Sequence, residues 1–194
     1  MRSLMSYVRV FYDKMLAAVY YFGSSNGVQR IYGHNSSYMH IDMLWQPADR
    51  IDEHLFLGNA YDAADYAVLQ DMNISTIVNA TRECRNYFEG TEGLSYHKID
   101  ILDSPTESMR PHFDEFVRFM DAHKDENILI HCYMGSSRSA TLVLLYLVLK
   151  YNMSVDFALA QLHEIRPAVN ININFLEELR QYLTDNNLPT PTQP

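Results

Sequence analysis

The chain has 194 residues, of which 47% are hydrophobic and 20% are charged, so it can build one domain with a full core. Its formal net charge of −9 and its isoelectric point of about 5.2 disfavour long-range attraction to RNA, DNA or anionic membranes. Two cysteines are too few for a small secreted fold that is held together by disulfides. A nucleic-acid-binding module and a disulfide-built scaffold are therefore disfavoured.

The first 22 residues predict an amphipathic helix that precedes the main domain. Their apolar side chains recur at spacings of four and three, as one helical face requires: Leu4, Val8, Phe11, Met15, Ala18 and Phe22. Because Arg9, Asp13 and Lys14 interrupt the apolar run, we expect neither a secretory signal nor stable membrane insertion. We hypothesise a homodimer formed through residues 1–22, with docking of this helix on the chain's own domain as the alternative.

The rest of the chain divides by composition. Residues 23–39 are rich in Gly, Ser, Asn and Tyr without a clear period, so we interpret 23–48 as a linker or loop. Three prolines close to the end of the sequence predict a loose tail over residues 186–194. The main domain is therefore expected at residues 49–185.

Within that domain, apolar strands alternate with helices. The predicted strands lie near 54–57, 74–79, 96–101 and 127–131. The predicted helices cover 60–71, 108–123, 137–151, 154–165 and 173–184. This order predicts an α/β domain with a mostly parallel central sheet flanked by helices. Ligands of such sheets bind beyond the carboxyl ends of the strands, and both Cys132 and the loop after Ile101 fall at that edge.

The most informative segment, His131 to Ser139, joins the last predicted strand to a long apolar helix. Backbone N–H groups at a helix N-terminus have no intrahelical partners and carry the positive end of the helix dipole, so this turn predicts an anion site. Gly135 allows the backbone to curl, and Arg138 supplies a planar fork that can hold two phosphate oxygens. The same positive field is expected to lower the pKa of the Cys132 thiol from about 8.5 to roughly 3.5–7.5, which makes it a nucleophile. The alternative is that Cys132 is a small buried apolar side chain at a strand end.

His131 to Ser139 resembles the signature of the cysteine-based protein phosphatases. Its ending, Ser137 to Ala140, is similar to the dual-specificity branch of the protein tyrosine phosphatase superfamily. Ile51 to Asn59 resembles the first strand of that family, and residues 166–175 resemble its closing Arg…Asn…Phe segment. The resemblance covers about residues 49–184. It implies a protein-tyrosine-phosphatase-like fold, here with an N-terminal helical extension.

The resemblance also implies a general acid on a loop that follows a strand. Its Tyr-x-x-Ile-x-x-x-Asp arrangement is reproduced by Tyr96, Ile99 and Asp103. A departing alcohol needs a proton, and of the two carboxyl groups in this segment, Asp100 and Asp103, we predict that Asp103 donates it. An Asp-Ser-Pro turn is also ordinary loop chemistry, so a structural role for Asp103 is the alternative.

The reaction implied by the resemblance has two steps and uses no metal and no cofactor. Cys132 attacks phosphorus, Arg138 and the loop amides bind the phosphate oxygens, and Asp103 protonates the leaving oxygen. The predicted phosphate-binding residues are consecutive: Tyr133, Met134, Gly135, Ser136, Ser137 and Arg138. Ser139 is expected to hydrogen-bond the departing sulfur, to cap the following helix, or both. The resemblance assigns to His131 the orientation of Cys132 through hydrogen bonds.

The expected substrates are phosphotyrosine and phosphoserine or phosphothreonine in proteins. The domain is shorter than that of tyrosine-only phosphatases, which implies a shallow pocket that the shorter side chains can also enter. The signature loop contains no lysine, whereas relatives that act on inositol phospholipids tend to place basic residues there. An RNA 5′ end or a phosphoinositide is the alternative substrate, and a phosphate-binding pseudophosphatase is the alternative function.

The second cysteine, Cys84, is expected to be inert. The alternative is a resolving thiol that traps oxidised Cys132 as a disulfide. A thiolate nucleophile needs a reducing compartment, so we expect an intracellular protein of the cytoplasm.

Overall fold

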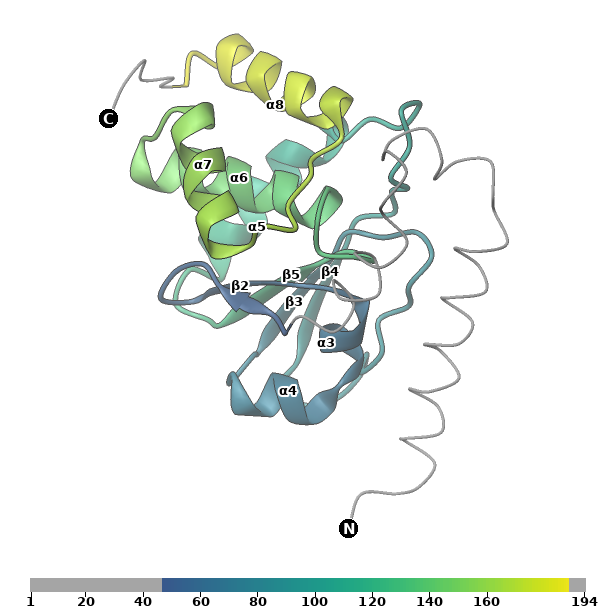
Figure 1. Ribbon diagram of the computed structural model, residues 1–194. Coiled ribbons are helices and arrows are strands. Elements are labelled where there is room, and N and C mark those ends of the chain that lie inside the picture. The colour runs from purple at the N-terminus through teal and green to yellow at the C-terminus, as the bar shows by residue number, and fades with distance from the viewer. Residues whose placement is uncertain (1–46, 189–194) are drawn as a thin grey trace. The chain divides into compact units, whose positions relative to one another are not determined.

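The computed structural model describes residues 47–188 (Figure 1). The helix and homodimer predicted for residues 1–22, the linker as far as residue 46, and residues 189–194 of the tail lie outside this part of the chain. Within residues 47–188, no helix is long and apolar enough to cross a membrane.

A five-stranded sheet forms the centre of the domain. In spatial order its strands are β1 (Asp49–Arg50), β2 (Leu55–Gly58), β5 (Ile128–His131), β3 (Thr76–Asn79) and β4 (Ser95–Lys98). β1 pairs with β2 in antiparallel orientation, and all other neighbours are parallel. The predicted α/β fold with a mostly parallel sheet is thus confirmed. The short edge strand β1 was not predicted.

The central position of β5 determines where the signature loop lies. Ile130 of β5 is in register with Leu57 of β2 and with Val78 of β3. Every residue of these three strands is buried, as expected for parallel strands covered on both faces. The chain therefore leaves β5 at the middle of the sheet's carboxyl edge, and the next residue is Cys132.

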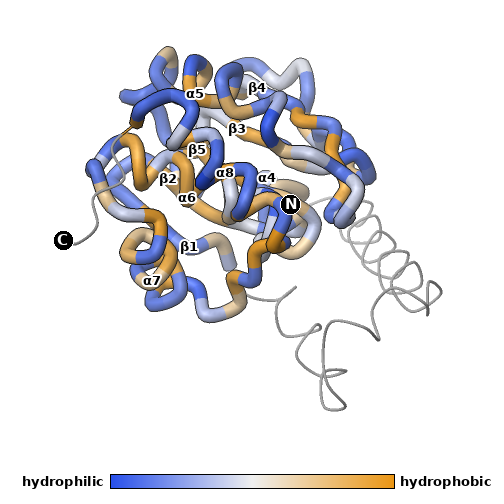
Figure 2. Tube along the Cα trace, turned by 90° about the horizontal axis from the view of Figure 1, so that it is seen from above, coloured by the Kyte–Doolittle hydropathy of each residue, from blue (hydrophilic) through white to orange (hydrophobic). Residues whose placement is uncertain are grey.

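Helices cover the two faces of the sheet (Figure 1). On one face lie α3 (Ala60–Ala64) and α4 (Tyr66–Asp71). On the other lie α5 (Phe113–Ala122), α6 (Arg138–Tyr151), α7 (Val155–Ile165) and α8 (Ile173–Asp185). Figure 2 shows that α6 is hydrophobic along much of its length, whereas hydrophilic and hydrophobic residues alternate on α5. The larger apolar cluster contains the buried apolar residues of α6, so this helix is anchored firmly behind the signature loop.

Two predicted helices need correction. Segment 60–71 forms α3 and α4 instead of one helix, because Asp65 adopts an extended conformation with ψ of 101°. Its carboxylate then accepts the backbone N–H groups of Ala67 and Val68 in the first turn of α4, so Asp65 ends one helix and caps the next. The helix predicted at 108–123 opens with a 3-10 turn, η2 (Arg110–His112), and becomes α-helical only at Phe113. β4 ends at Lys98, before the predicted limit at Ile101.

Candidate active site

The signature loop is a tight turn that glycine makes possible. Gly135 has φ of +70°, in the left-handed region, and a Cβ there would lie 2.6 Å from the carbonyl oxygen of Gly58 at the end of β2. Tyr133 continues this contact, since its carbonyl oxygen accepts the N–H of Ala60 at 3.1 Å. The loop is therefore held against the start of α3.

Arg166 holds the loop from outside. This side chain is fully buried, its Nε donates to the carbonyl oxygen of Gly135 at 2.9 Å, and its Nη1 pairs with Asp49. The N–H of Asn170 also donates to the carbonyl oxygen of Ser136, at 2.9 Å. Residues of segment 166–175 thus hold the signature loop in place. Asp49 of β1 supplies the negative charge that pairs with Arg166.

The Cys132 sulfur lies at the bottom of the loop with only 1% of the residue exposed. It accepts the backbone N–H of Gly135 at 3.2 Å and the hydroxyl of Ser139 at 3.1 Å. Burial alone would raise the pKa of this thiol. The positive charge of Arg138 and the hydrogen bonds from Ser139 outweigh burial and lower the pKa below its ordinary value. The surroundings therefore favour a thiolate.

Arg138 lies beside that sulfur and is oriented by a residue that the sequence analysis did not single out. Its Nη1 lies 2.7 and 2.9 Å from the two carboxylate oxygens of Glu83, in the loop after β3, and donates to the carbonyl oxygen of Ile101 at 3.2 Å. Its Nε is buried and has no hydrogen-bond partner among the described residues. One edge of the guanidinium is thus fixed, and a donor on its other edge is available to an oxyanion.

Asp103, the predicted proton donor, lies beside the signature loop, and its catalytic role stays a prediction. Its Oδ1 accepts the Ser137 hydroxyl at 3.0 Å and the Asn172 side-chain amide at 3.5 Å, while its Oδ2 lies 3.9 Å from Nε of Arg138. The other carboxylate weighed for this role, Asp100, is paired with Arg82 at 2.9 Å. The geometry therefore brings Asp103 to the loop and ties Asp100 to a different cation.

The other predicted site residues differ in their contacts and burial. Ser139 does not cap α6: the N-cap residue is Ser137, and the Ser139 hydroxyl points to the sulfur. Burial lowers the pKa of His131 to about 4, so its ring is neutral at pH 7, and its Nδ1–H donates to the carbonyl oxygen of Cys132 at 3.2 Å. Met134 is partly buried and Ser136 is buried.

Cys84 lies outside this cluster of donors. It is buried in the loop after β3, and burial raises the pKa of its thiol. Both cysteines are free thiols in this structure. That Cys84 is inert, or alternatively a resolving thiol for oxidised Cys132, stays a prediction.

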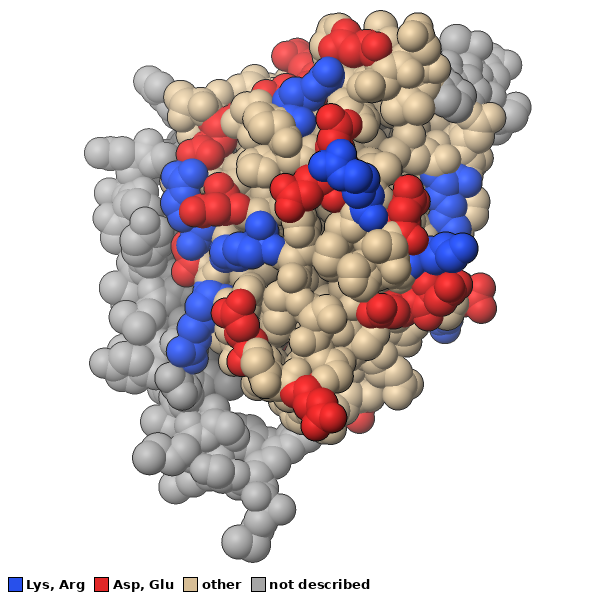
Figure 3. Space-filling model, turned by 180° about the vertical axis from the view of Figure 1, so that it is seen from behind, with Lys and Arg blue, Asp and Glu red and all other residues tan. Residues whose placement is uncertain are grey.

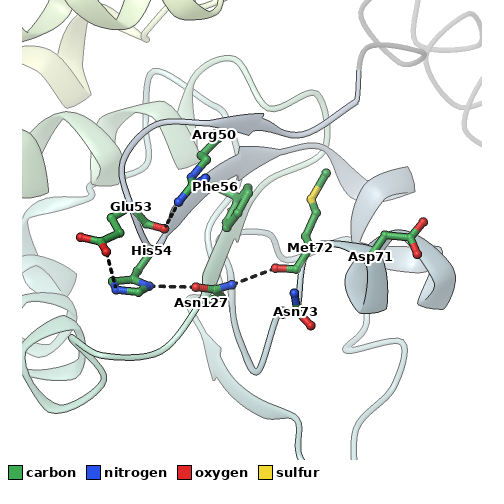
Figure 4. A pocket seen from close by; sticks show the side chains of 8 residues that line it. All are labelled: Arg50, Glu53, His54, Phe56, Asp71, Met72, Asn73 and Asn127. Atoms are coloured by element: carbon green, nitrogen blue, oxygen red, sulfur yellow. Dashed lines mark hydrogen bonds and ion pairs between the residues drawn. The ribbon is translucent and has the colours of Figure 1, made fainter.

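A separate hollow of about 470 Å³ lies at the opposite end of the strands (Figure 4). His54 and Asn127, which precede β2 and β5, line it together with Arg50, and His54 is hydrogen-bonded to Asn127 at 2.9 Å. None of the predicted site residues lines this hollow. Residues 47–188 contain no group of three His, Cys, Asp or Glu side chains arranged to hold a metal ion.

Solved structures share this fold and define its class. Human tyrosine phosphatase-like serine/threonine/tyrosine-interacting protein is 27% identical, with a TM-score of 0.68 over 73% of this chain and 98% of that chain. A mouse putative dual specificity phosphatase complexed with zinc tungstate is 26% identical, with a TM-score of 0.68 over 75% of this chain and 94% of that chain. The fold is therefore that of the phosphatase domains built around a strand–loop–helix signature.

Sequence comparison narrows the class to a family. The model of the dual specificity phosphatase catalytic domain matches residues 55–185. Protein phosphatase Slingshot homolog 3 of Rattus norvegicus is 37% identical over 137 residues, 70% of this chain and 21% of that protein. Dual specificity protein phosphatase Mpk3 of Drosophila melanogaster is 30% identical over 138 residues, 70% of this chain and 34% of that protein. The chain belongs to the dual specificity phosphatase family, which confirms the resemblance seen in the sequence, and it spans a minor part of these relatives' length.

Proposed function

We propose that this chain is a protein phosphatase that hydrolyses phosphotyrosine and phosphoserine or phosphothreonine through a cysteinyl-phosphate intermediate. One observation carries the proposal. The buried sulfur of Cys132 accepts two hydrogen bonds, from Gly135 and Ser139, beside a buried Arg138 whose Nε has no hydrogen-bond partner among residues 47–188. A nucleophile and an oxyanion-binding donor are thereby placed together in a water-poor site.

In the first step, the Cys132 thiolate attacks phosphorus, the S–P bond forms, and the bond from phosphorus to the leaving oxygen breaks. Arg138 and the loop amides hold the equatorial oxygens, while protonated Asp103 gives its proton to the leaving oxygen. In the second step, water attacks phosphorus, Asp103 takes a proton from that water, and the S–P bond breaks. The Ser139 hydroxyl, 3.1 Å from the sulfur, stabilises the departing thiolate.

The test is turnover of a small aryl phosphate followed by acid quenching and mass spectrometry of Cys132. We expect phosphate on the Cys132 peptide in the wild type, no turnover in Cys132→Ser, and slow turnover in Asp103→Asn. Asp100→Asn is the matched control, because Asp100 is three residues away and pairs with Arg82 instead of the loop. A folded wild-type protein that binds phosphate but shows no turnover would instead make this chain a pseudophosphatase.

The choice of a phosphoprotein as substrate rests on the absence of lysine in the signature loop and on the charge of the chain. The net charge is −9, and the face drawn in Figure 3 carries basic and acidic side chains interspersed, without a basic field over that face. The mouse putative dual specificity phosphatase is complexed with tungstate, a tetrahedral oxyanion like phosphate, which supports an oxyanion site in this chain too. Because the nucleophile is a thiolate, we propose that the enzyme acts in a reducing compartment of the cell.

Rates on phosphopeptides, a phosphoinositide and a 5′-phosphorylated RNA at one salt concentration test the substrate class. We expect kcat/KM to be highest for the phosphopeptides. A higher value for either other substrate would replace the proposed substrate while leaving the cysteine chemistry intact.

A further inference from the structure

Two exposed aliphatic side chains stand at the mouth of the proposed active site. Residues 47–188 contain five exposed large hydrophobic side chains: Tyr66, Leu102, Tyr151, Ile165 and Ile173. The two tyrosines have structural contacts, since Tyr66 packs on Phe88 and the hydroxyl of Tyr151 donates to Asp52 at 2.7 Å. Ile173 is the most exposed of the five, at 60%, and Leu102 is exposed at 36%.

Leu102 and Ile173 come from distant parts of the sequence, and each adjoins a residue of the hydrogen-bond network around the proposed acid. Leu102 directly precedes Asp103, and Ile173 directly follows Asn172, whose side-chain amide donates to Asp103 at 3.5 Å. The backbone N–H of Asn172 also donates to the hydroxyl of Ser137, which in turn donates to Asp103 at 3.0 Å. These bonds hold the two chain segments that carry the aliphatic residues close together beside the signature loop.

The loop conformation keeps Leu102 turned outward. Ile101 is fully buried in the core, and its carbonyl oxygen accepts Nη1 of Arg138 at 3.2 Å. A second bond, from the side-chain amide of Asn174 to the carbonyl oxygen of Pro105, ties the same loop to the start of α8. The backbone around both residues is therefore fixed, so a ligand that covers them does not have to order this part of the chain.

Part of each side chain stays in water in the free protein, 60% of Ile173 and 36% of Leu102. Ile173 is the first residue of α8, a position whose side chain serves neither the core nor the cap, since Asn172 supplies the cap and Phe175 enters the core. Apolar surface that stays in water in the free protein becomes favourable when a ligand removes it from water. The expected ligand is the proposed phosphoprotein substrate, because the active site binds it next to these two side chains.

We infer that Leu102 and Ile173 form an aliphatic rim that selects phosphopeptides with an aliphatic residue next to the phosphorylated residue. The inference rests on the proposed function. Since the Cys132 sulfur is almost fully buried, only the phosphorylated side chain can reach it, and the peptide backbone must cross the mouth where Asp103 lies. The neighbouring peptide side chain then lies over the rim. An aliphatic side chain matches it, whereas a hydroxyl or a charge would lose water without gaining a partner.

The experiment compares two phosphopeptides that differ only in the residues adjacent to the phosphorylated residue, leucine in one and serine in the other. For the wild type, we expect kcat/KM to be roughly 5- to 20-fold higher for the leucine peptide, somewhat below the discrimination of an enclosed apolar pocket. In the double variant Leu102→Ser/Ile173→Ser, the ratio should fall to about 1. Because both peptides report on the same enzyme preparation, the ratio cancels any change in the shared chemistry.

The matched control is Ile165→Ser, at the end of α7, which removes an exposed aliphatic side chain that does not adjoin Asp103 or Asn172. It should keep the wild-type ratio. A ratio near 1 in the wild type, or an unchanged ratio in the double variant, would overturn the rim while leaving the phosphatase intact. Absence of turnover of every peptide and of a small aryl phosphate would instead overturn the proposed function.

Discussion

The loops after β5 and after β3 each carry a buried cysteine, yet their surroundings shift the two pKa values in opposite directions. Burial raises the pKa of both thiols. At Cys132, the charge of Arg138 and the hydrogen bonds from Ser139 reverse that effect. At Cys84, hydrogen bonds from Thr81 and Tyr87 and the charge of Arg138 lower the pKa, but burial and the negative charge of Glu83 outweigh them. A buried thiol becomes a nucleophile only where hydrogen bonds and a positive charge outweigh the cost of burial.

The largest expected effect is a difference in reactivity between the two thiols. At pH 6, iodoacetamide should label Cys132 on the order of 10³ times faster than Cys84, because the thiolate fraction follows the pKa. Peptide mass spectrometry over time measures both rates in one sample. Inorganic phosphate should protect Cys132 selectively, and equal labelling rates would contradict the contrast between the two thiols.

Replacing the cation should make Cys132 more like Cys84. Arg138→Lys keeps a positive charge but loses the planar fork and the contact with Glu83, so we expect kcat/KM for an aryl phosphate to fall by about 10²–10³. The pKa of Cys132, measured as the midpoint of the alkylation rate against pH, should rise. Arg118→Lys, at an exposed position of α5, is the control and should leave both values unchanged. An unshifted midpoint in Arg138→Lys would mean that a positive charge without the planar fork is enough to ionise the thiol.

The free energy of unfolding also depends on pH, and this dependence must be known before the two thiols are compared at different pH values. Burial lowers the pKa of His131 to about 4, so its unfolded form binds more protons below about pH 6.5, and stability is lost as the pH falls toward 4. Burial raises the pKa of Asp62 to about 6. Its folded form therefore binds more protons between about pH 4 and 6, and stability is lost as the pH rises through that range. Each contribution is about 3 kcal/mol, and the two oppose each other.

Asp62→Asn removes one of the opposing contributions. We expect the free energy of unfolding of this variant to fall by about 3 kcal/mol between pH 6.5 and 4, whereas the wild type changes less. Urea unfolding at several pH values in this interval measures it. Asp71→Asn, at an exposed position of α4, should follow the wild type. Parallel curves for Asp62→Asn and the wild type would show that Asp62 titrates normally.

The smallest expected effect concerns Glu83, which joins the two regions because it precedes Cys84 and binds Arg138. Glu83→Ala should lower kcat/KM about tenfold, since a hydrogen bond between charged groups is worth roughly 1.5–3 kcal/mol and this one is partly exposed. The same variant should lower the pKa of Cys84 by removing a neighbouring negative charge. Glu83→Gln should fall between Ala and the wild type. Wild-type kcat/KM in Glu83→Ala would show that Ile101 positions Arg138 alone.

The sequence predicted the parts of the site that are local. His131 to Ser139 is a continuous strand–loop–helix segment, so its cysteine, glycine and arginine could be placed from spacing and apolar pattern. Asp103 could be predicted only through a resemblance, because its nearness to Ser137 depends on how two strand ends meet. The same locality explains why α6, α7 and α8 agree with the predicted helices to within one residue.

The sequence did not predict contacts that depend on the finished fold. Glu83 and Arg138 are 55 residues apart, and Asp49 and Arg166 are 117 apart, so no local pattern marks either pair. The division of 60–71 into two helices did have a local signal. Asp65 is a favourable N-cap residue, but the apolar pattern continues across it and concealed the break.

The close approach of Gly135 to the carbonyl oxygen of Gly58 constrains the evolution of the chain as well as its chemistry. A side chain at 135 would need both a left-handed backbone and a displaced β2, so substitutions there should reduce cellular abundance even in a Cys132→Ser background. Selection for a stable protein would thus preserve this glycine after selection for turnover had ceased. Descendants that have lost the nucleophile should still display the glycine as an inherited trace of the enzyme.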